Sequence, residues 1–119
     1  MNSENKWLER TELLVGEDVL KGLQNSTVVI VGVGGVGGYA AEMVTRAGVG
    51  RVVVIDSDVV SETNKNRQLL AMDSTIGLPK VDVIASRLKD ISPKIQIYPV
   101  GEYLTEENIP TVLDQIDEK

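Results

Sequence analysis

The sequence predicts an α/β fold, namely the first half of a Rossmann-like, doubly wound parallel sheet preceded by a helical arm. Three observations favour this fold. Short β-branched runs at 27–31 and 52–55 alternate with segments of helical periodicity. A glycine-rich stretch follows the first run directly, and an acidic residue, Asp56, ends the second.

The composition is ordinary for one small globular domain, with 119 residues of which 42% are hydrophobic and 25% are charged. The chain has no cysteine and no histidine, which excludes thiol nucleophiles, imidazole bases and the usual zinc ligands from its chemistry. The net charge of −6 argues against broad electrostatic binding to nucleic acid, and an aromatic content of 3% leaves no stacking platform for single strands. We find no signal pattern and no apolar run of membrane-spanning length, and expect a cytoplasmic protein.

The first segment, 1–26, is expected to form the helical arm. Apolar residues recur at helical spacing over 7–24, and Gly16 interrupts them, so the arm should have two pieces. The run 27–31 is continuous and β-branched, as in a strand that helices cover on both faces. We assign 27–119 to the first half of the Rossmann-like domain.

The next elements alternate in the same way. The segment 36–47 has apolar residues at helical spacing and ends at Gly48, which suits a left-handed helix cap. The set expected to face the core is Val36, Ala40, Met43, Val44 and Ala47. The run 52–55 predicts a second buried strand.

The segment 57–77 lacks clear periodicity and predicts an irregular connection, with a short helix around 68–72. Pro79 suits the first position of a helix whose apolar residues recur from Val81 to Ile91. The run 95–100 alternates and contains a proline, which is typical of an outer strand. A last helix is expected over 105–116, with Pro110 starting its regular part.

The predicted strand order is 3-2-1 in a single parallel sheet. A complete sheet of this kind continues with a fourth strand beside the first. We therefore expect these residues to be the N-terminal portion of a larger protein.

The glycine-rich stretch 32–38 predicts a nucleotide site. Gly32, Gly34 and Gly37 fit G-x-G-x-x-G between a strand and a helix, where the backbone can approach a phosphate and helix N–H groups can donate to it. Asp56 follows about twenty residues later, where a carboxylate can accept hydrogen bonds from ribose hydroxyls. This context favours a nucleotide over the alternative of a tight turn alone.

The identity of the nucleotide depends on two cations. An NAD-dependent oxidoreductase or a non-catalytic nucleotide-binding module would show the same loop and acid, so both remain alternatives. Arg67 can bind two phosphate oxygens with its planar guanidinium, and Lys80 can supply a point charge. Either residue alone could be a surface cation, but together with the loop they favour ATP.

The order and spacing of these motifs resemble the ThiF/MoeB/HesA family of ubiquitin-activating-type adenylating enzymes. The resemblance runs from about Trp7 to the end of the chain. It is carried by Gly32-x-Gly34-Gly35-x-Gly37, Asp56-x-Asp58, Asn64-x-Asn66-Arg67-Gln68 and Gly77-x-Pro79-Lys80-Val81. Residues 9–13, 47–50 and 66–68 are most similar to the branch that dehydrates tRNA threonylcarbamoyladenosine.

The resemblance implies ATP-dependent adenylation of a carboxylate, with pyrophosphate leaving together with Mg²⁺. In the dehydratase branch the carboxylate belongs to the threonylcarbamoyl group of a tRNA adenosine, and an internal attack then closes a ring and releases AMP. The alternative within the family is adenylation of the C-terminus of a ubiquitin-like sulfur-carrier protein. A homodimer is also implied, in which Arg10 reaches across as an arginine finger.

The residues that the resemblance assigns to the nucleotide are Gly32, Gly34, Gly35, Gly37, Asp56, Asp58, Asn64, Arg67, Gln68 and Lys80. Arg10, Arg67 and Lys80 would be catalytic. The aspartate that binds Mg²⁺ in relatives is expected beyond Lys119, and Asp58, Asp73 and Asp82 are not expected to replace it, so this segment alone should be inactive. The RNA-binding surface should lie outside the chain or at a local basic cluster such as Lys65 and Arg67.

Overall fold

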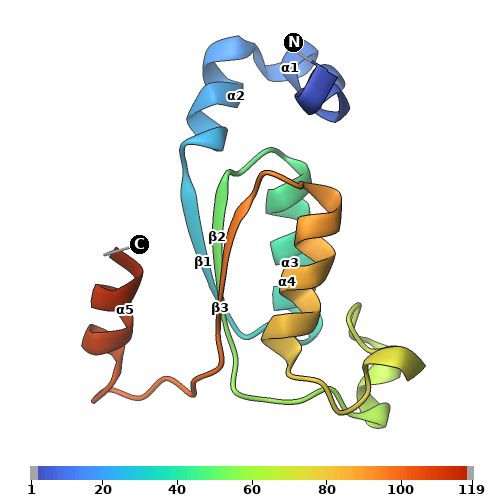
Figure 1. The fold of residues 1–119 in the computed structure, drawn as a ribbon, viewed down its shortest axis with the longest axis vertical. Coiled ribbons are helices and arrows are strands. Elements are labelled where there is room, and N and C mark those ends of the chain that lie inside the picture. The colour runs from blue at the N-terminus through green and yellow to red at the C-terminus, as the bar shows by residue number, and fades with distance from the viewer. Residues whose placement is uncertain (1–2, 118–119) are drawn as a thin grey trace.

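The computed structural model describes residues 3–117 and contains a three-stranded parallel sheet with helices on both faces (Figure 1). The strands β1 (Thr27–Val31), β2 (Arg51–Ile55) and β3 (Gln96–Val100) lie in the order β1-β2-β3. The register aligns Val29 with Val53 and Val53 with Tyr98. The predicted α/β fold and strand order are confirmed.

The arm consists of the 3₁₀ helix η1 (Ser3–Leu8) followed by α1 (Glu9–Val15) and α2 (Glu17–Gln24). The predicted break at Gly16 is confirmed by its φ of 91°. The arm lies at the end of the sheet where the strands begin (Figure 1). Buried Leu8 and Leu20 pack there against Gly48.

Helices α3 (Gly35–Arg46) and α4 (Lys80–Ile91) cover one face of the sheet, and α5 (Ile109–Asp117) lies on the other (Figure 1). The central strand β2 contributes side chains to the core on both faces of the sheet, because successive side chains point to opposite faces. Val52 and Val54 join the core under α3 and α4, whereas Val53 and Ile55 join the core under α5. The prediction of a buried second strand is therefore confirmed. No helix among residues 3–117 has the length and apolarity needed to cross a membrane.

The face of α3 that meets the core differs in part from the prediction, although Val44 packs against the core as expected. Val36 and Met43 are 86% and 55% exposed, and Ala47 is exposed as well. The buried residues are Gly38, Ala41, Glu42 and Thr45. The start of α3 approaches the glycine stretch so closely that Gly37 and Gly38 leave no room for larger side chains there.

The outer strand β1 is also less buried than predicted. Its burial alternates along the strand, and Val29 and Val31 are 39% and 62% exposed. The reason is position, because β1 is an edge strand of the described sheet and α5 packs on Val53 and Ile55 of β2 rather than on β1. The expectation of helices on both faces of β1 was therefore wrong for the described residues.

The connection between β2 and α4 contains no helix over 68–72. Two 3₁₀ helices, η2 (Glu62–Asn66) and η3 (Asp73–Thr75), flank that segment instead. The Thr75 hydroxyl stabilises the turn that contains η3. It accepts a hydrogen bond from the Met72 N–H at 2.9 Å and donates one to the Leu70 carbonyl at 2.7 Å. Pro79 is the residue before α4 rather than its first residue.

The last helix, α5, begins four residues later than its predicted start. Thr105 and Asn108 exchange side-chain and backbone hydrogen bonds just before it, at 2.7 and 3.2 Å. The regular helix then includes Pro110 in its first turn, as predicted.

Candidate nucleotide site

The glycine-rich stretch begins at the carboxyl end of β1. The Gly32 N–H donates to the Ile55 carbonyl at 2.8 Å, which continues the pairing with β2 beyond the strand. Gly32 has a φ of +84°, a conformation that suits glycine, and the chain then enters α3 at Gly35. The first N–H groups of α3 therefore lie beside the carboxyl edge of the sheet, where a helix start favours an anion.

Asp56 fixes this stretch to the end of β2. One carboxylate oxygen accepts the Val33 N–H at 2.9 Å, and the other accepts the Asp58 N–H at 2.8 Å. An ionised carboxylate has about four lone-pair positions, so two hydrogen bonds leave acceptor capacity on the same group. Asp56 can hold the loop and still accept from ribose hydroxyls.

Lys80 is a buried cation at the start of α4, with only 6% of its surface exposed. Its Nζ lies 4.0 Å from an oxygen of Asp58, and its N–H donates to the Asp58 carbonyl at 3.0 Å. Lysine is rarely this buried, and a cation in the first turn of a helix opposes the helix dipole. The Asp58 carboxylate offsets part of these costs, and a phosphate beside Nζ would offset more.

Gln68 connects the loop after β2 to the glycine stretch, and Asn64 holds that loop together. Asn64 is buried, and its side-chain oxygen accepts the Ser61 N–H at 2.9 Å. The Gln68 Nε2 lies 3.1 Å from the position that a β-carbon on Gly34 would occupy. The Gln68 Oε1 is buried and has no hydrogen-bond partner among the described residues. Gln68 thus packs on the loop and retains a free acceptor there.

The two arginines assigned to catalysis are placed differently. Arg67 is exposed, and its Nη1 donates to the Thr63 carbonyl at 3.2 Å and to Asn66 Oδ1 at 3.0 Å. It lies on the same loop, between Asn64 and Gln68. Arg10 is on α1, at the opposite end of the sheet from the glycine stretch (Figure 1). Within one copy, several of the expected site residues lie at the end of the sheet where the strands finish, but Arg10 does not. The residues at that end are the glycines, Asp56, Asp58, Asn64, Gln68 and Lys80.

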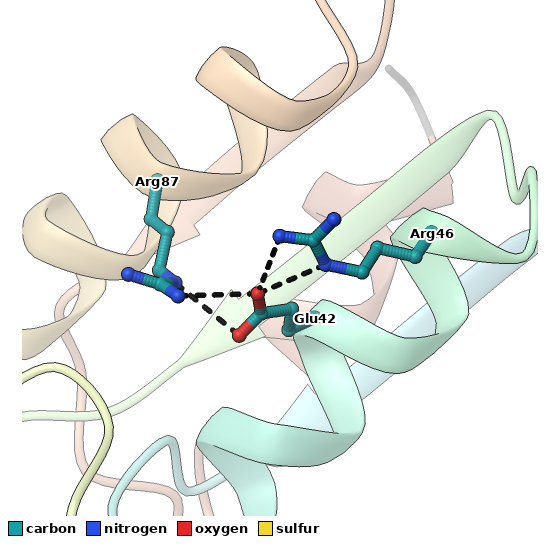
Figure 2. A network of polar contacts seen from close by, with 3 residues as sticks. All are labelled: Glu42, Arg46 and Arg87. Atoms are coloured by element: carbon teal, nitrogen blue, oxygen red, sulfur yellow. Dashed lines mark hydrogen bonds and ion pairs between the residues drawn. The ribbon is translucent and has the colours of Figure 1, made fainter. Parts of the chain in front are cut away.

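One polar cluster was not found from the sequence. The buried Glu42 carboxylate contacts the guanidiniums of Arg46 and Arg87 (Figure 2), at 2.9 and 3.2 Å for the two Nη2 atoms. Hydrogen bonding to Arg87, with a smaller contribution from Arg46, holds the pKa of Glu42 below its ordinary 4.5 although burial acts to raise it. The i,i+4 spacing of Glu42 and Arg46 could have indicated one pair, whereas Arg87 is distant in sequence and joins only in the folded chain.

Comparison with known proteins relates the chain to a family. Residues 8–118 match the model of the ThiF family. The chain is 47% identical over 105 residues to a tRNA threonylcarbamoyladenosine dehydratase of Bacillus subtilis, covering 88% of this chain and 41% of that protein. It is 38% identical over 100 residues to a molybdopterin-synthase adenylyltransferase of Escherichia coli, covering 84% of this chain and 40% of that protein.

The fold is also similar to a solved structure with a bound nucleotide. That structure is the E. coli tRNA N6-threonylcarbamoyladenosine dehydratase in complex with ATP, with a TM-score of 0.92 and 33% identity. The similarity covers 96% of this chain and 47% of the solved one. The chain thus spans less than half the length of the relatives that it matches here.

Proposed function

Because the chain belongs to the ThiF family, we propose that the protein carrying it is an ATP-dependent adenylating enzyme whose acceptor is the threonylcarbamoyl carboxylate on a tRNA adenosine. The strongest support is the arrangement at the carboxyl end of the strands. There Asp56 holds the glycine stretch, and buried Lys80 lies 4.0 Å from Asp58. The names of the B. subtilis relative and of the ATP complex support the choice of substrate and nucleotide.

The proposed reaction has two steps. An oxygen of the acceptor carboxylate attacks the α-phosphorus of ATP, the bond to the β-phosphate breaks, and pyrophosphate leaves. A nucleophile of the same modified nucleoside then attacks the activated acyl carbon, which closes a ring and releases AMP. The acceptor therefore loses one oxygen to AMP, and the nucleoside loses the elements of water.

The chain's own residues would position and neutralise the nucleotide. Asp56 accepts from the ribose, while the N–H groups at the start of α3 face the phosphates. Lys80 and Arg67 offset the negative charge that develops on the phosphate oxygens and the leaving pyrophosphate, which is where a fixed cation accelerates such a step most. Gln68 keeps the loop after β2 against Gly34, and Asn64 holds that loop together.

Mg²⁺ would accompany the triphosphate as its counter-ion. Within residues 3–117 there is no group of three or more acidic, histidine or cysteine side chains that could hold a metal ion. We therefore assign none of these residues to the ion and no reaction step to it. A tRNA substrate would place the protein in the cytoplasm.

The position of Arg10 supports the expected homodimer. Since α1 lies at the opposite end of the sheet from the glycine stretch, Arg10 can serve a nucleotide only in a second copy. We infer a homodimer in which each arm reaches the partner's site.

Adenylation of a sulfur-carrier protein is the second candidate, because the chain is also similar to a molybdopterin-synthase adenylyltransferase. The deciding experiment incubates the full-length protein and ATP with tRNA that contains threonylcarbamoyladenosine. We expect AMP, pyrophosphate and, by mass spectrometry, a nucleoside lighter by one water. AMP formation only with a carrier protein would favour the second candidate, and calorimetric binding of NAD without binding of ATP would overturn adenylation altogether.

A further inference from the structure

Trp7 lies far from the candidate nucleotide site, at the end of the sheet where the strands begin. It belongs to η1 and is 40% exposed. Its side chain lines a concavity of about 380 Å³ together with Arg46, Arg87, Asp90 and Ile91. The last residue of α3 and the final turns of α4 therefore meet the arm at this concavity.

The two arginines are held in place by a buried carboxylate. Arg46 and Arg87 each bond Glu42 through Nε and Nη2, with distances between 2.9 and 3.2 Å (Figure 2). No hydrogen bond to Glu42 involves Nη1 of either arginine, and the two side chains are 54% and 36% exposed. Glu42 thus orients two guanidiniums whose remaining N–H groups can serve a ligand, at little further cost in side-chain entropy.

The groups around Trp7 match the chemistry of a nucleotide. The indole ring offers a stacking face, and the arginines offer donors for a phosphate. Asp90 offers an acceptor for a ribose hydroxyl or a base amino group. Two further concavities along Trp7 include Lys94 in their lining, which adds a cation beside the ring. An acidic peptide would leave the indole face unused.

We propose that this concavity, the Trp7 site (Trp7, Arg46, Arg87 and Asp90), binds one unstacked nucleotide of an RNA strand, with the base on the indole and the phosphate on the arginines. The inference rests on the proposed function for the identity of the RNA, which is the tRNA substrate. The proposal departs from the expectation that 3% aromatic residues leave no stacking platform, because one exposed ring can stack on one base.

The Trp7 site is proposed in addition to the expected basic cluster at Lys65 and Arg67, which stays a prediction. Lys65 pairs with Asp73, just as Arg46 and Arg87 pair with Glu42, so ion pairing does not distinguish the two places. Strands of five residues separate the two ends of the sheet by about 16 Å, so the Trp7 site can hold a part of the RNA other than the reacting nucleoside.

The test measures tRNA binding by the full-length protein in filter-binding titrations without ATP, at several salt concentrations. Trp7→Ala should weaken binding about ten-fold, since loss of one stacked base costs roughly that much. Trp7→Leu retains apolar packing and should weaken binding equally, whereas Trp7→Tyr should retain most of the affinity. The matched control is Tyr103→Ala, which removes a ring that is 75% exposed elsewhere and should change nothing. Arg46→Gln should lower the slope of log K against log salt by about one.

Folded Trp7→Ala and Trp7→Leu variants that bind tRNA as tightly as the unchanged protein would overturn the Trp7 site. Displacement of tRNA by a polyglutamate peptide as readily as by a single-stranded RNA oligonucleotide would also overturn it. AMP formation is measured separately. If RNA binding depends on Trp7 but no AMP forms, only the proposed function is overturned. If AMP forms but RNA binding does not depend on Trp7, only the Trp7 site is overturned.

Discussion

A β-carbon on Gly37 would lie 1.6 Å from the carbonyl oxygen of Gly32, so the first turn of α3 touches the end of β1 backbone to backbone. No side chain can be accommodated at this contact unless α3 moves away from the sheet. The glycine stretch therefore allows α3 to pack closely against the end of β1, in addition to being a candidate phosphate loop.

The first prediction compares two neighbouring glycines. Gly37→Ala should lower the free energy of unfolding by about 3 kcal/mol, the upper part of the usual cost of overpacking. Gly35→Ala should change it by less than about 0.5 kcal/mol, because its β-carbon would meet no atom within 4 Å. Urea denaturation of both variants checks this, and equal stability for the pair would contradict the close contact.

The second prediction concerns Arg67. Arg67→Ala should reduce the rate of AMP formation by about a hundred- to a thousand-fold, the usual cost of losing one fixed donor to a developing charge. Its thermal unfolding should not change, because Arg67 is exposed. Lys65→Ala, on the same loop and paired with Asp73, is the control and should remain active. Full activity of Arg67→Ala would remove Arg67 from the site.

The third prediction concerns the buried cation. Lys80→Met retains an unbranched side chain of similar size but removes the charge. The fold should therefore persist, while ATP affinity and AMP formation fall at least ten-fold. Lys21→Met is the matched control, because Lys21 is 65% exposed on the arm and should not affect the nucleotide. Calorimetric titration with ATP measures the difference, and unchanged affinity in Lys80→Met would contradict a phosphate at this position.

The fourth prediction concerns Glu42. Glu42→Gln should destabilise the fold by about 2 kcal/mol, below the usual cost of breaking a buried ion pair, because both arginines can still reach water. In the folded chain the carboxylate has a pKa below its ordinary 4.5. At a pH between the folded pKa and 4.5, the unfolded chain therefore binds more protons than the folded chain. The contribution of Glu42 is therefore complete above pH 4.5 and is lost as the pH falls through the lower, folded value.

The measurement is the pH dependence of urea unfolding for the unchanged chain and for Glu42→Gln. The gap between the two curves should narrow as the pH falls below 4.5. A gap that stays constant down to strongly acidic pH would show that Glu42 does not act through its charge.

The strands and the outline of the site follow from local patterns. Continuous β-branched runs predicted β1 and β2 to within one residue, and the spacing from Val81 to Ile91 predicted the buried face of α4. The glycine stretch and Asp56 were likewise found from residue types and spacing alone. These features depend on near neighbours in sequence.

The features that were missed depend on distant residues. The close approach of α3 to Gly32 occurs at Gly37, and the helix buries Ala41 while Val36 is exposed. The burial of Lys80, the contact of Gln68 with Gly34 and the pairing of Arg87 with Glu42 each join segments that a periodic pattern does not relate.

Asp56 accepts hydrogen bonds from the backbone on both sides of the site, at Val33 and at Asp58. A nucleotide that binds only this arrangement stabilises the folded protein in proportion to the logarithm of its concentration relative to its dissociation constant. Protease resistance should then rise with nucleotide supply. On the proposed function, the lifetime of this protein in a starved cell would shorten as ATP is depleted, before any change in its synthesis.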